Sequence, residues 1–158
     1  MFTDDYGHKY LKHTVNRPFI NEDIIYEPIF GTWTVSDSEP LILTEGITDA
    51  IMAHQAGFNC ISPVTKHFKQ DHYDVLESYC QRASSVYILN DSEDSGQGAQ
   101  GGIKTALYLD EQEIDARIGH LPRPDGMVKM DMAEFLRNNP AGELMPILED
   151  AVPPEEAP

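Results

Sequence analysis

The stretch SVYILNDSEDSGQGAQGG, residues 85–102, joins an apolar run to a cluster of acids and then to a run of glycines. A short apolar run bounded by turn residues predicts a buried strand, and the apolar spacing after the glycines predicts a helix. The glycines also spell G-x-G-x-x-G at positions 96, 98 and 101. The stretch therefore fits either a phosphate cradle for a dinucleotide or a carboxylate site for a metal ion, and these two sites need opposite charges.

The dinucleotide interpretation has some support, because Asp115 lies roughly 20 residues beyond the glycines, where the fingerprint places an acid. The fingerprint, however, needs its glycines directly after the strand. Here Asp91, Glu93 and Asp94 come first. Like charges at ~4 Å cost about 1–4 kcal/mol, so these acids disfavour a bare pyrophosphate. We therefore expect the glycines to shape the turn and to let the helix pack closely.

Strand-like and helix-like stretches alternate from residue 41 onward. This alternation predicts βαβ units. We predict an α/β fold with a central, mostly parallel, four-stranded sheet and helices on both faces. Gly57 ends the first helix. The predicted strands are 41–44, 60–64, 85–89 and 113–121, and the predicted inward helix faces carry Ile47, Ala50, Ile51 and Phe58, then Val75, Leu76, Tyr79 and Cys80, then Ala99, Ile103, Ala106 and Leu107.

The two ends of the chain differ from this core. We predict that residues 1–40 form a lead-in segment packed on the core and that residues 41–140 form the main domain. Residues 141–158 predict a C-terminal helix followed by an acidic, proline-rich tail, EDAVPPEEAP, which its composition marks as disordered.

Composition bounds the class of protein. The chain has 158 residues, 41% of them hydrophobic, which suits one globular domain. It has no run of eighteen or more apolar residues and no signal peptide, so we expect a soluble, cytoplasmic protein with no membrane contact. Cys60 and Cys80 lie far apart, and we expect both to be core thiols.

The net charge of −16, from 27 acidic and 11 basic residues, repels phosphate backbones and argues against nonspecific nucleic-acid binding. A salt-loving host or a solubilising surface explains most of these acids. A subset that converges on a divalent metal ion is the other explanation, and composition does not choose between them.

Acids follow two of the predicted strands at their carboxyl ends, where open α/β sheets bind ligands. Glu45 ends the first strand, Gly46 permits a sharp turn, and Asp49 lies in the first turn of the helix. Asp91 and Glu93 are two apart, so their side chains point the same way in an extended backbone. Such carboxylates repel one another unless a cation such as Mg²⁺ or Mn²⁺ neutralises them. Glu45, Asp91 and Glu93 are therefore the predicted metal ligands.

Three segments together resemble the Toprim domain of DnaG-type primases: LILTEGITDAIMAHQAGF, VYILNDSEDSGQGA and VKMDMAEFLRNN. That family has E-G-x-x-D after its first strand, D-x-D after its third, and then a lysine and an aspartate before a short helix. The resemblance covers about residues 5–140, because KYLKHTVNRPFINEDIIYEPIFG is similar to the family's lead-in. It implies the Toprim (Rossmann-like) fold.

The resemblance also implies roles for individual residues. Glu45 matches the family's glutamate, a general acid or base beside the metal, and Asp91 and Glu93 match its D-x-D, with glutamate replacing the second aspartate. Lys129 and Asp131 match the downstream lysine and aspartate, which makes Lys129 a second candidate catalytic residue. Asp131 then has a supporting role, and we expect the same of Asp49 and Asp94, the latter as a turn or cap residue.

Two basic residues and one histidine complete the candidates. Lys66 and Lys69 follow the second strand, so they either bind a nucleic-acid phosphate beside the acids or belong to a solvated loop. His54 lies on the predicted core-facing side of its helix. We expect it to be a buried histidine rather than a metal ligand.

The resemblance implies metal-dependent nucleotidyl transfer. In a primase the metal orients a nucleoside triphosphate while a primer 3′ hydroxyl attacks the α-phosphorus on a single-stranded template. A helicase or other replication protein is a candidate partner. No zinc-binding segment precedes the domain, so the chain is predicted to be either a fragment or a minimal stand-alone protein.

Three alternatives remain. A Toprim nuclease uses the same ions to cleave phosphodiesters, and a noncatalytic metal-binding domain uses the acidic surface to bind a basic partner. A receiver domain of flavodoxin-like type fits less well, because it needs adjacent acids where Glu45 is followed by Gly46.

Overall fold

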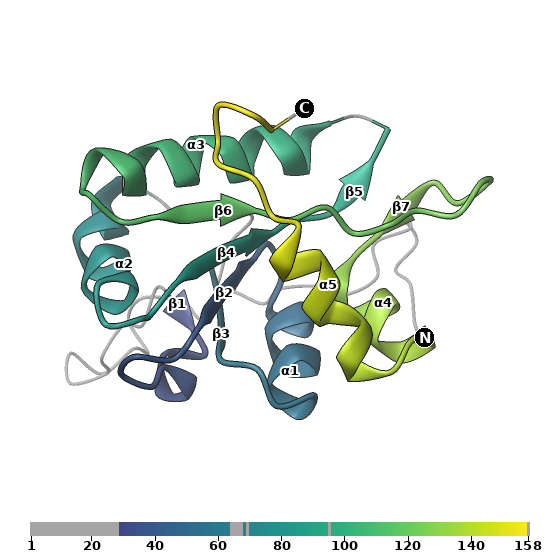
Figure 1. Ribbon diagram of the computed structural model, residues 1–158, viewed down its shortest axis with the longest axis horizontal. Coiled ribbons are helices and arrows are strands. Elements are labelled where there is room, and N and C mark those ends of the chain that lie inside the picture. Colours follow the sequence, from purple (N-terminus) through teal and green to yellow (C-terminus); the bar gives the residue numbers. More distant parts are fainter. Residues whose placement is uncertain (1–28, 64–67, 69, 95, 158) are drawn as a thin grey trace, which may run out of the picture.

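The computed structural model describes residues 29–63, 68, 70–94 and 96–157 (Figure 1). The strands are β1 (Ile29–Phe30), β2 (Leu41–Thr44), β3 (Cys60–Pro63), β4 (Val86–Leu89), β5 (Ser92–Glu93), β6 (Ala116–Ile118) and β7 (Lys129–Met130). The α-helices are α1 (Ile47–Gln55), α2 (Tyr73–Cys80), α3 (Gln97–Glu111), α4 (Met132–Asn138) and α5 (Leu144–Glu149), and short 3₁₀ turns span Thr32–Thr34, Gln70–His72 and Ala141–Glu143. None of the helices in the described ranges has the length and apolar character needed to cross a membrane.

Strand β2 lies at the centre of the main sheet, whose order is β1-β3-β2-β4-β6. It pairs in parallel with both β3 and β4, and β4 pairs in parallel with β6. Strand β1 runs antiparallel to β3 at the edge. The predicted parallel four-stranded sheet is therefore confirmed, and one short antiparallel strand extends it. Strands β5 and β7 form a separate two-stranded ribbon.

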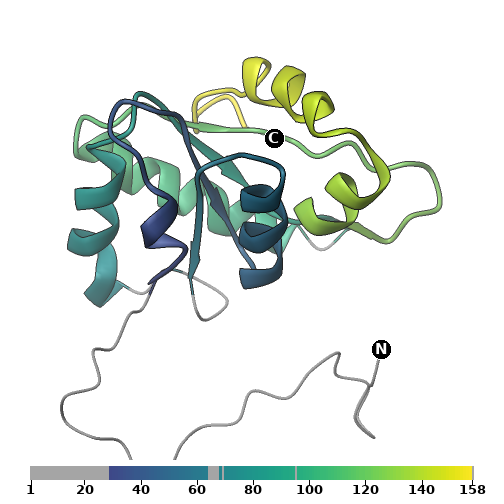
Figure 2. The same ribbon diagram turned by 90° about the horizontal axis from the view of Figure 1, so that it is seen from below.

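Helices cover both faces of the main sheet, as predicted (Figure 2). Leu41 and Leu43 of β2 belong to the core under α2 and α3, whereas Ile42, between them, belongs to the core under α1, α4 and α5. This alternation follows from the pleat, which points successive side chains to opposite faces. Cys60 and Cys80 are buried free thiols, one in each core, as expected.

The buried stripe of α1 differs from the predicted one. Asp49, Ala50 and Ala53 are buried, whereas Ile51 is 41% exposed and His54 is exposed. The prediction of a core-facing His54 was therefore wrong. Small residues let α4 approach α1 closely, so the contact runs along Ala50 and Ala53 rather than along the larger apolar side chains. Two other residues of the predicted inward faces are also exposed, Val75 and Leu107.

Residues 29–40 and the C-terminus both contact the sheet. Thr34 accepts a hydrogen bond from the backbone N–H of Cys60 at 3.1 Å, so the turn after β1 docks on β3. At the other edge, Val152 and Ile118 exchange two backbone hydrogen bonds of 2.7 and 3.0 Å. The C-terminal tail was expected to be disordered, but these two bonds hold it against β6 at Val152. The division into three segments stays a prediction, and residues 1–28 of the lead-in lie outside the described residues.

Glycines in the first turns of α3 let the helix pack directly on β4 and on the segment after it. A Cβ atom on Gly98 would lie 2.5 Å from the carbonyl oxygen of Asp91, and one on Gly102 would lie 3.2 Å from Ile88. Gly96 enters the helix with φ +67°, a backbone conformation that glycine adopts without strain. These contacts confirm that the glycines shape the turn and permit close packing.

A Gly98→Ala substitution should therefore lower the free energy of unfolding by about 1–3 kcal/mol, because the new methyl group collides with backbone that has no room to move. The measurement is urea denaturation followed by circular dichroism. Gly142→Ala is the matched control, since a Cβ there meets nothing within 4 Å and the change should stay within about 0.5 kcal/mol. Equal stability of the two variants would contradict the tight packing of α3.

Candidate active site

The carboxyl ends of β2 and β4 lie side by side at one edge of the sheet. Thr44 and Leu89, the last residues of these strands, are register partners. Glu45 follows Thr44 directly, and Asp91 lies two residues beyond Leu89. The structure thus brings Glu45 and Asp91, two of the predicted metal ligands, to neighbouring strand ends.

The Glu45 carboxylate faces the first turn of α3. Its Oε2 atom is buried and has no hydrogen-bond partner among the described residues, and a Cβ on Gly98 would lie 3.3 Å from it. Burial raises the pKa of Glu45 to about 7, and the negative charge of Asp91 adds to the rise, whereas the Lys129 ammonium opposes it. Glu45 is therefore an acid that exchanges a proton near neutral pH.

Asp91 forms an ion pair with Lys129 between Oδ2 and Nζ. The Asp91 side chain is only 11% exposed and that of Lys129 is 42% exposed. Burial raises the pKa of Asp91 and outweighs the opposing effect of Lys129. Burial by itself lowers the pKa of Lys129. The hydrogen bond and the charge of Asp91, with other nearby acids, outweigh burial and raise the pKa overall, so Lys129 remains an ammonium.

The β5–β7 ribbon sets the position of Lys129. Glu93 and Lys129 are cross-strand partners in this antiparallel pair, next to the pair of Ser92 and Met130. Met130 is buried in the core under α4, which anchors β7. Lys129 therefore contacts Asp91 through an ion pair and is the strand partner of Glu93.

Asp94 points away from this group. Its carboxylate, 76% exposed, forms an ion pair of 2.5 Å with Arg123, which also donates a 3.0 Å hydrogen bond to the carbonyl of Val128. Arg123 was not predicted as a site residue. It lies 29 positions from Asp94 in a proline-rich loop, and no periodic pattern in the sequence connects the two. The ion pair ties the loop before β7 to the turn after β5.

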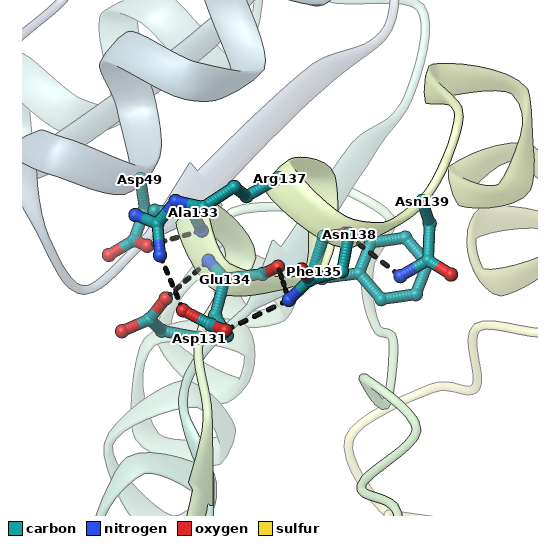
Figure 3. A network of polar contacts seen from close by, with 8 residues as sticks. All are labelled: Asp49, Asp131, Ala133, Glu134, Phe135, Arg137, Asn138 and Asn139. Carbon is teal, nitrogen blue, oxygen red and sulfur yellow. Dashed lines mark hydrogen bonds and ion pairs between the residues drawn. The ribbon is translucent and has the colours of Figure 1, made fainter.

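Asp49 and Asp131 both bind the N-terminus of α4 (Figure 3). Asp131 is the N-cap and accepts a 2.7 Å hydrogen bond from the backbone N–H of Glu134. Asp49, from α1, accepts one of 2.9 Å from the N–H of Ala133. Burial raises the pKa of Asp49 to about 6, and the Ala133 N–H opposes that rise. Asp49 therefore holds the N-terminus of α4 against α1, whereas Asp131 caps its own helix directly after β7.

Gly46 makes room for this arrangement. A Cβ on Gly46 would lie 2.4 Å from Oδ2 of Asp49. The Asp49 carboxylate therefore leaves no room for a side chain at this position. The expected reason for this glycine, a sharp turn, was wrong, because Gly46 has an extended backbone with φ −120° and ψ 145° that other residues also adopt.

The geometry contradicts the dinucleotide interpretation. Asp115 lies just before the amino end of β6, which is parallel to β4. The glycines follow the carboxyl end of β4, so the two lie at opposite ends of the strands. It pairs with Arg117 at 3.2 Å. The first turn of α3 also faces the Glu45 carboxylate, which would repel a phosphate there.

Two cavities flank the strand ends. The larger, of about 390 Å³, is lined by residues that include Thr44, Glu45, Tyr73, Asn90, Gln97 and Lys104. The smaller, of about 90 Å³, has Asn90, Asp91, Glu93 and His120 among its lining residues. Asn90 stands between them and donates a 2.9 Å hydrogen bond to the carbonyl of Gly98. The acids thus border space on both sides of the β4 end.

The donor chemistry of the site fits a hard divalent cation. Glu45, Asp91 and Glu93 offer carboxylate oxygens, the ligands that Mg²⁺ prefers, and Oε2 of Glu45 is buried with no partner among the described residues. As the side chains stand, no three His, Cys, Asp or Glu residues in the described part of the chain are grouped closely enough to hold an ion. Lys129 supplies positive charge at Asp91 instead. The predicted phosphate-binding Lys66 and Lys69 lie outside the described residues.

Comparison with known proteins gives consistent results. The chain is 24% identical over 145 residues to a DNA primase of Campylobacter jejuni, a match that covers 91% of this chain but 22% of that protein. Among solved structures it is similar to the Aquifex aeolicus primase zinc-binding and RNA polymerase domains (TM-score 0.63, 20% identity, 80% of this chain and 31% of that one). It is equally similar to a DnaG primase catalytic domain bound to single-stranded DNA (TM-score 0.63, 21% identity, 85% and 44%).

These similarities agree with the resemblance that the three motifs predicted. The solved structures share the fold, and the chain spans about a fifth of the curated primase that it matches. A sequence model of the Toprim-like family matches residues 42–136, from the first parallel strand through α4. Because that range is more than half of the chain, the protein belongs to the Toprim-like family.

Proposed function

We propose that this chain is the metal-dependent catalytic domain of a primase-like nucleotidyltransferase, which joins nucleoside triphosphates into a primer on a single-stranded template. The matched relative is a DNA primase, and one structural neighbour was solved with single-stranded DNA. Because the chain covers only part of these proteins, activity, substrate and partners are proposals. A helicase or other replication protein as partner stays a prediction.

The observation that carries the proposal is the group formed by Glu45, Asp91 and Lys129 at the carboxyl edge of the sheet. Glu45 and Asp91 come from neighbouring parallel strands, and β7 delivers Lys129 onto Asp91. An open α/β sheet binds its ligands at this edge. Acids with raised pKa values beside a charged partner mark a functional site more often than an ordinary surface.

Glu45, Asp91 and Glu93 are the residues that would hold Mg²⁺ or Mn²⁺. Such an ion, when bound, orients the triphosphate and neutralises the charge that develops on it. Glu45 would either hold the ion or take a proton from the attacking hydroxyl. Asp49 and Asp131 act as positioning residues, because Asp49 holds α4 against α1 and Asp131 caps the helix that follows Lys129.

Phosphate binding falls to the basic groups. The Lys129 ammonium is close to half exposed, and its flexible stem can reach a phosphate oxygen at the rim of the site. Lys66 and Lys69 remain proposed contacts for the nucleic-acid backbone.

A noncatalytic interaction domain is the second candidate, and two observations favour it. Lys129 already neutralises Asp91, and the described acids do not close around an ion. In that case the site stabilises the fold, and the acidic surface binds a basic partner. Activity assays with matched variants separate the two candidates.

Glu45→Gln and Asp91→Asn should each reduce primer synthesis by ~100-fold or more, because each removes a charge that acts at the reacting phosphate. The assay supplies a single-stranded template, nucleoside triphosphates and Mg²⁺ or Mn²⁺, and separates products on a denaturing gel. Glu155→Gln, an exposed glutamate of the C-terminal tail, is the matched control and should retain full activity.

Other outcomes of this assay are equally informative. Cleavage of the template without synthesis would assign a nuclease. Folded wild-type protein that binds the ion but neither synthesises nor cleaves would favour the interaction domain.

Glu45→Gln should also change how stability depends on pH in metal-free buffer. The folded-state pKa of about 7 lies above the ordinary value of 4.5, so the folded protein binds the extra proton and loses stability as pH rises between these values. Glutamine removes that loss. The variant should therefore be more stable than wild type at about pH 8 and show little difference at about pH 4, as measured by urea denaturation. A parallel pH profile for both proteins would show that Glu45 is ionised without penalty.

A further inference from the structure

We propose that Lys129 is a built-in competitor of the metal ion, so that its ammonium leaves Asp91 when a divalent cation binds. This inference rests on the proposed metal site and adds the regulation of that site. Its basis is the position of the Lys129 ammonium. Lys129 forms an ion pair with the largely buried Asp91 and is the strand partner of Glu93, and both acids are proposed metal ligands.

The ion pair uses an atom that a metal ion needs. Lys129 binds Oδ2 of Asp91, and the side chain of Asp91 is largely buried, so little of that carboxylate is open to another cation while the pair exists. An ammonium and a divalent cation on the same carboxylate repel each other. Occupation by one therefore weakens the other.

Lys129 can be displaced. It is held by a two-residue strand, β7, and its side chain is much more exposed than that of Asp91. Its long stem lets the ammonium swing away while the backbone stays paired with Glu93. The backbone on either side is fixed independently, by buried Met130 and by the Asp131 cap of α4. Movement of the side chain alone is enough to free the carboxylate.

The Lys129 ammonium also offsets part of the negative charge of the carboxylates before an ion binds. The charges of Asp91, Asp131 and Glu45 each act on the ammonium, and Glu93 is the cross-strand partner of Lys129. A single lysine offsets only part of this negative charge. The remainder favours a doubly charged ion, which is the driving force for exchange.

Lys129→Gln should tighten Mn²⁺ binding by about fivefold or more, an effect of roughly 1 kcal/mol. The measurement is the free Mn²⁺ signal in electron paramagnetic resonance during titration, at constant ionic strength and with Mg²⁺ as competitor. Lys129→Arg keeps the charge and should bind Mn²⁺ no more tightly than wild type.

Arg117→Gln is the matched control. It removes a cation of similar exposure from an ion pair with Asp115 at the opposite edge of the sheet, so it reports the effect of net charge alone. Its Mn²⁺ affinity should equal that of wild type. Thermal unfolding gives a second readout: without metal Lys129→Gln should melt below wild type, and Mn²⁺ should raise its Tm by more.

The outcomes separate this inference from the proposed function. Equal or weaker Mn²⁺ binding by Lys129→Gln, with wild type binding the ion, would overturn the competition alone. No Mn²⁺ uptake by wild type or by Lys129→Gln would overturn both the metal site and the competition. Tighter binding by Lys129→Gln together with a wild type that makes no primer would uphold the competition and favour the noncatalytic domain.

Discussion

The parallel register of β2 and β4 is the constraint on which the site depends. Thr44 and Leu89 are partners, so the chain leaves both strands at the same level and on the same edge of the sheet. Glu45 and Asp91 therefore follow neighbouring strand ends. Because β2 is buried on both faces, a shift of register by one residue would move Leu41 and Leu43 out of the core under α2 and α3 and into the core where Ile42 packs. The hydrophobic cores therefore fix the distance between the two acids.

The second theme is how acids crowded at one edge are stabilised. Four of these acids each have a hydrogen-bond or ion-pair partner of their own. The pairs are Asp49 with the N–H of Ala133, Asp91 with Lys129, Asp94 with Arg123, and Asp131 with the N–H of Glu134. Oε2 of Glu45 stands apart, buried and without a partner among the described residues, and its raised pKa expresses that cost. Among the described residues, this oxygen and the hydroxyl of Ser62 are the buried side-chain polar atoms without a hydrogen-bond partner, and the first is consistent with the proposed role of Glu45.

Sequence patterns predicted the parts of this structure that local chemistry determines. The strand at 41–44, the glycine-rich entry to α3 and the positions of Glu45 and Asp91 follow from apolar runs, turn residues and the direction of parallel strands. The β5–β7 ribbon was not predicted, because two-residue strands have no periodicity. Arg123 and the capping role of Asp49 were missed for a related reason: their partners lie far along the chain. The wrong placement of His54 arose because contact with α4 selects small residues rather than the largest apolar ones.

The central claim is that Glu45 and Asp91 share one divalent cation. Titration of Mn²⁺ into ¹⁵N-labelled protein tests it most directly, since the paramagnetic ion broadens amide signals around its site. We expect the signals of Gly46, Asn90 and Ser92 to broaden first and together, at concentrations too low to affect the rest of the spectrum. Earlier broadening at exposed acids elsewhere, such as Asp110 or Glu149, or uniform broadening over the acidic surface, would contradict the account.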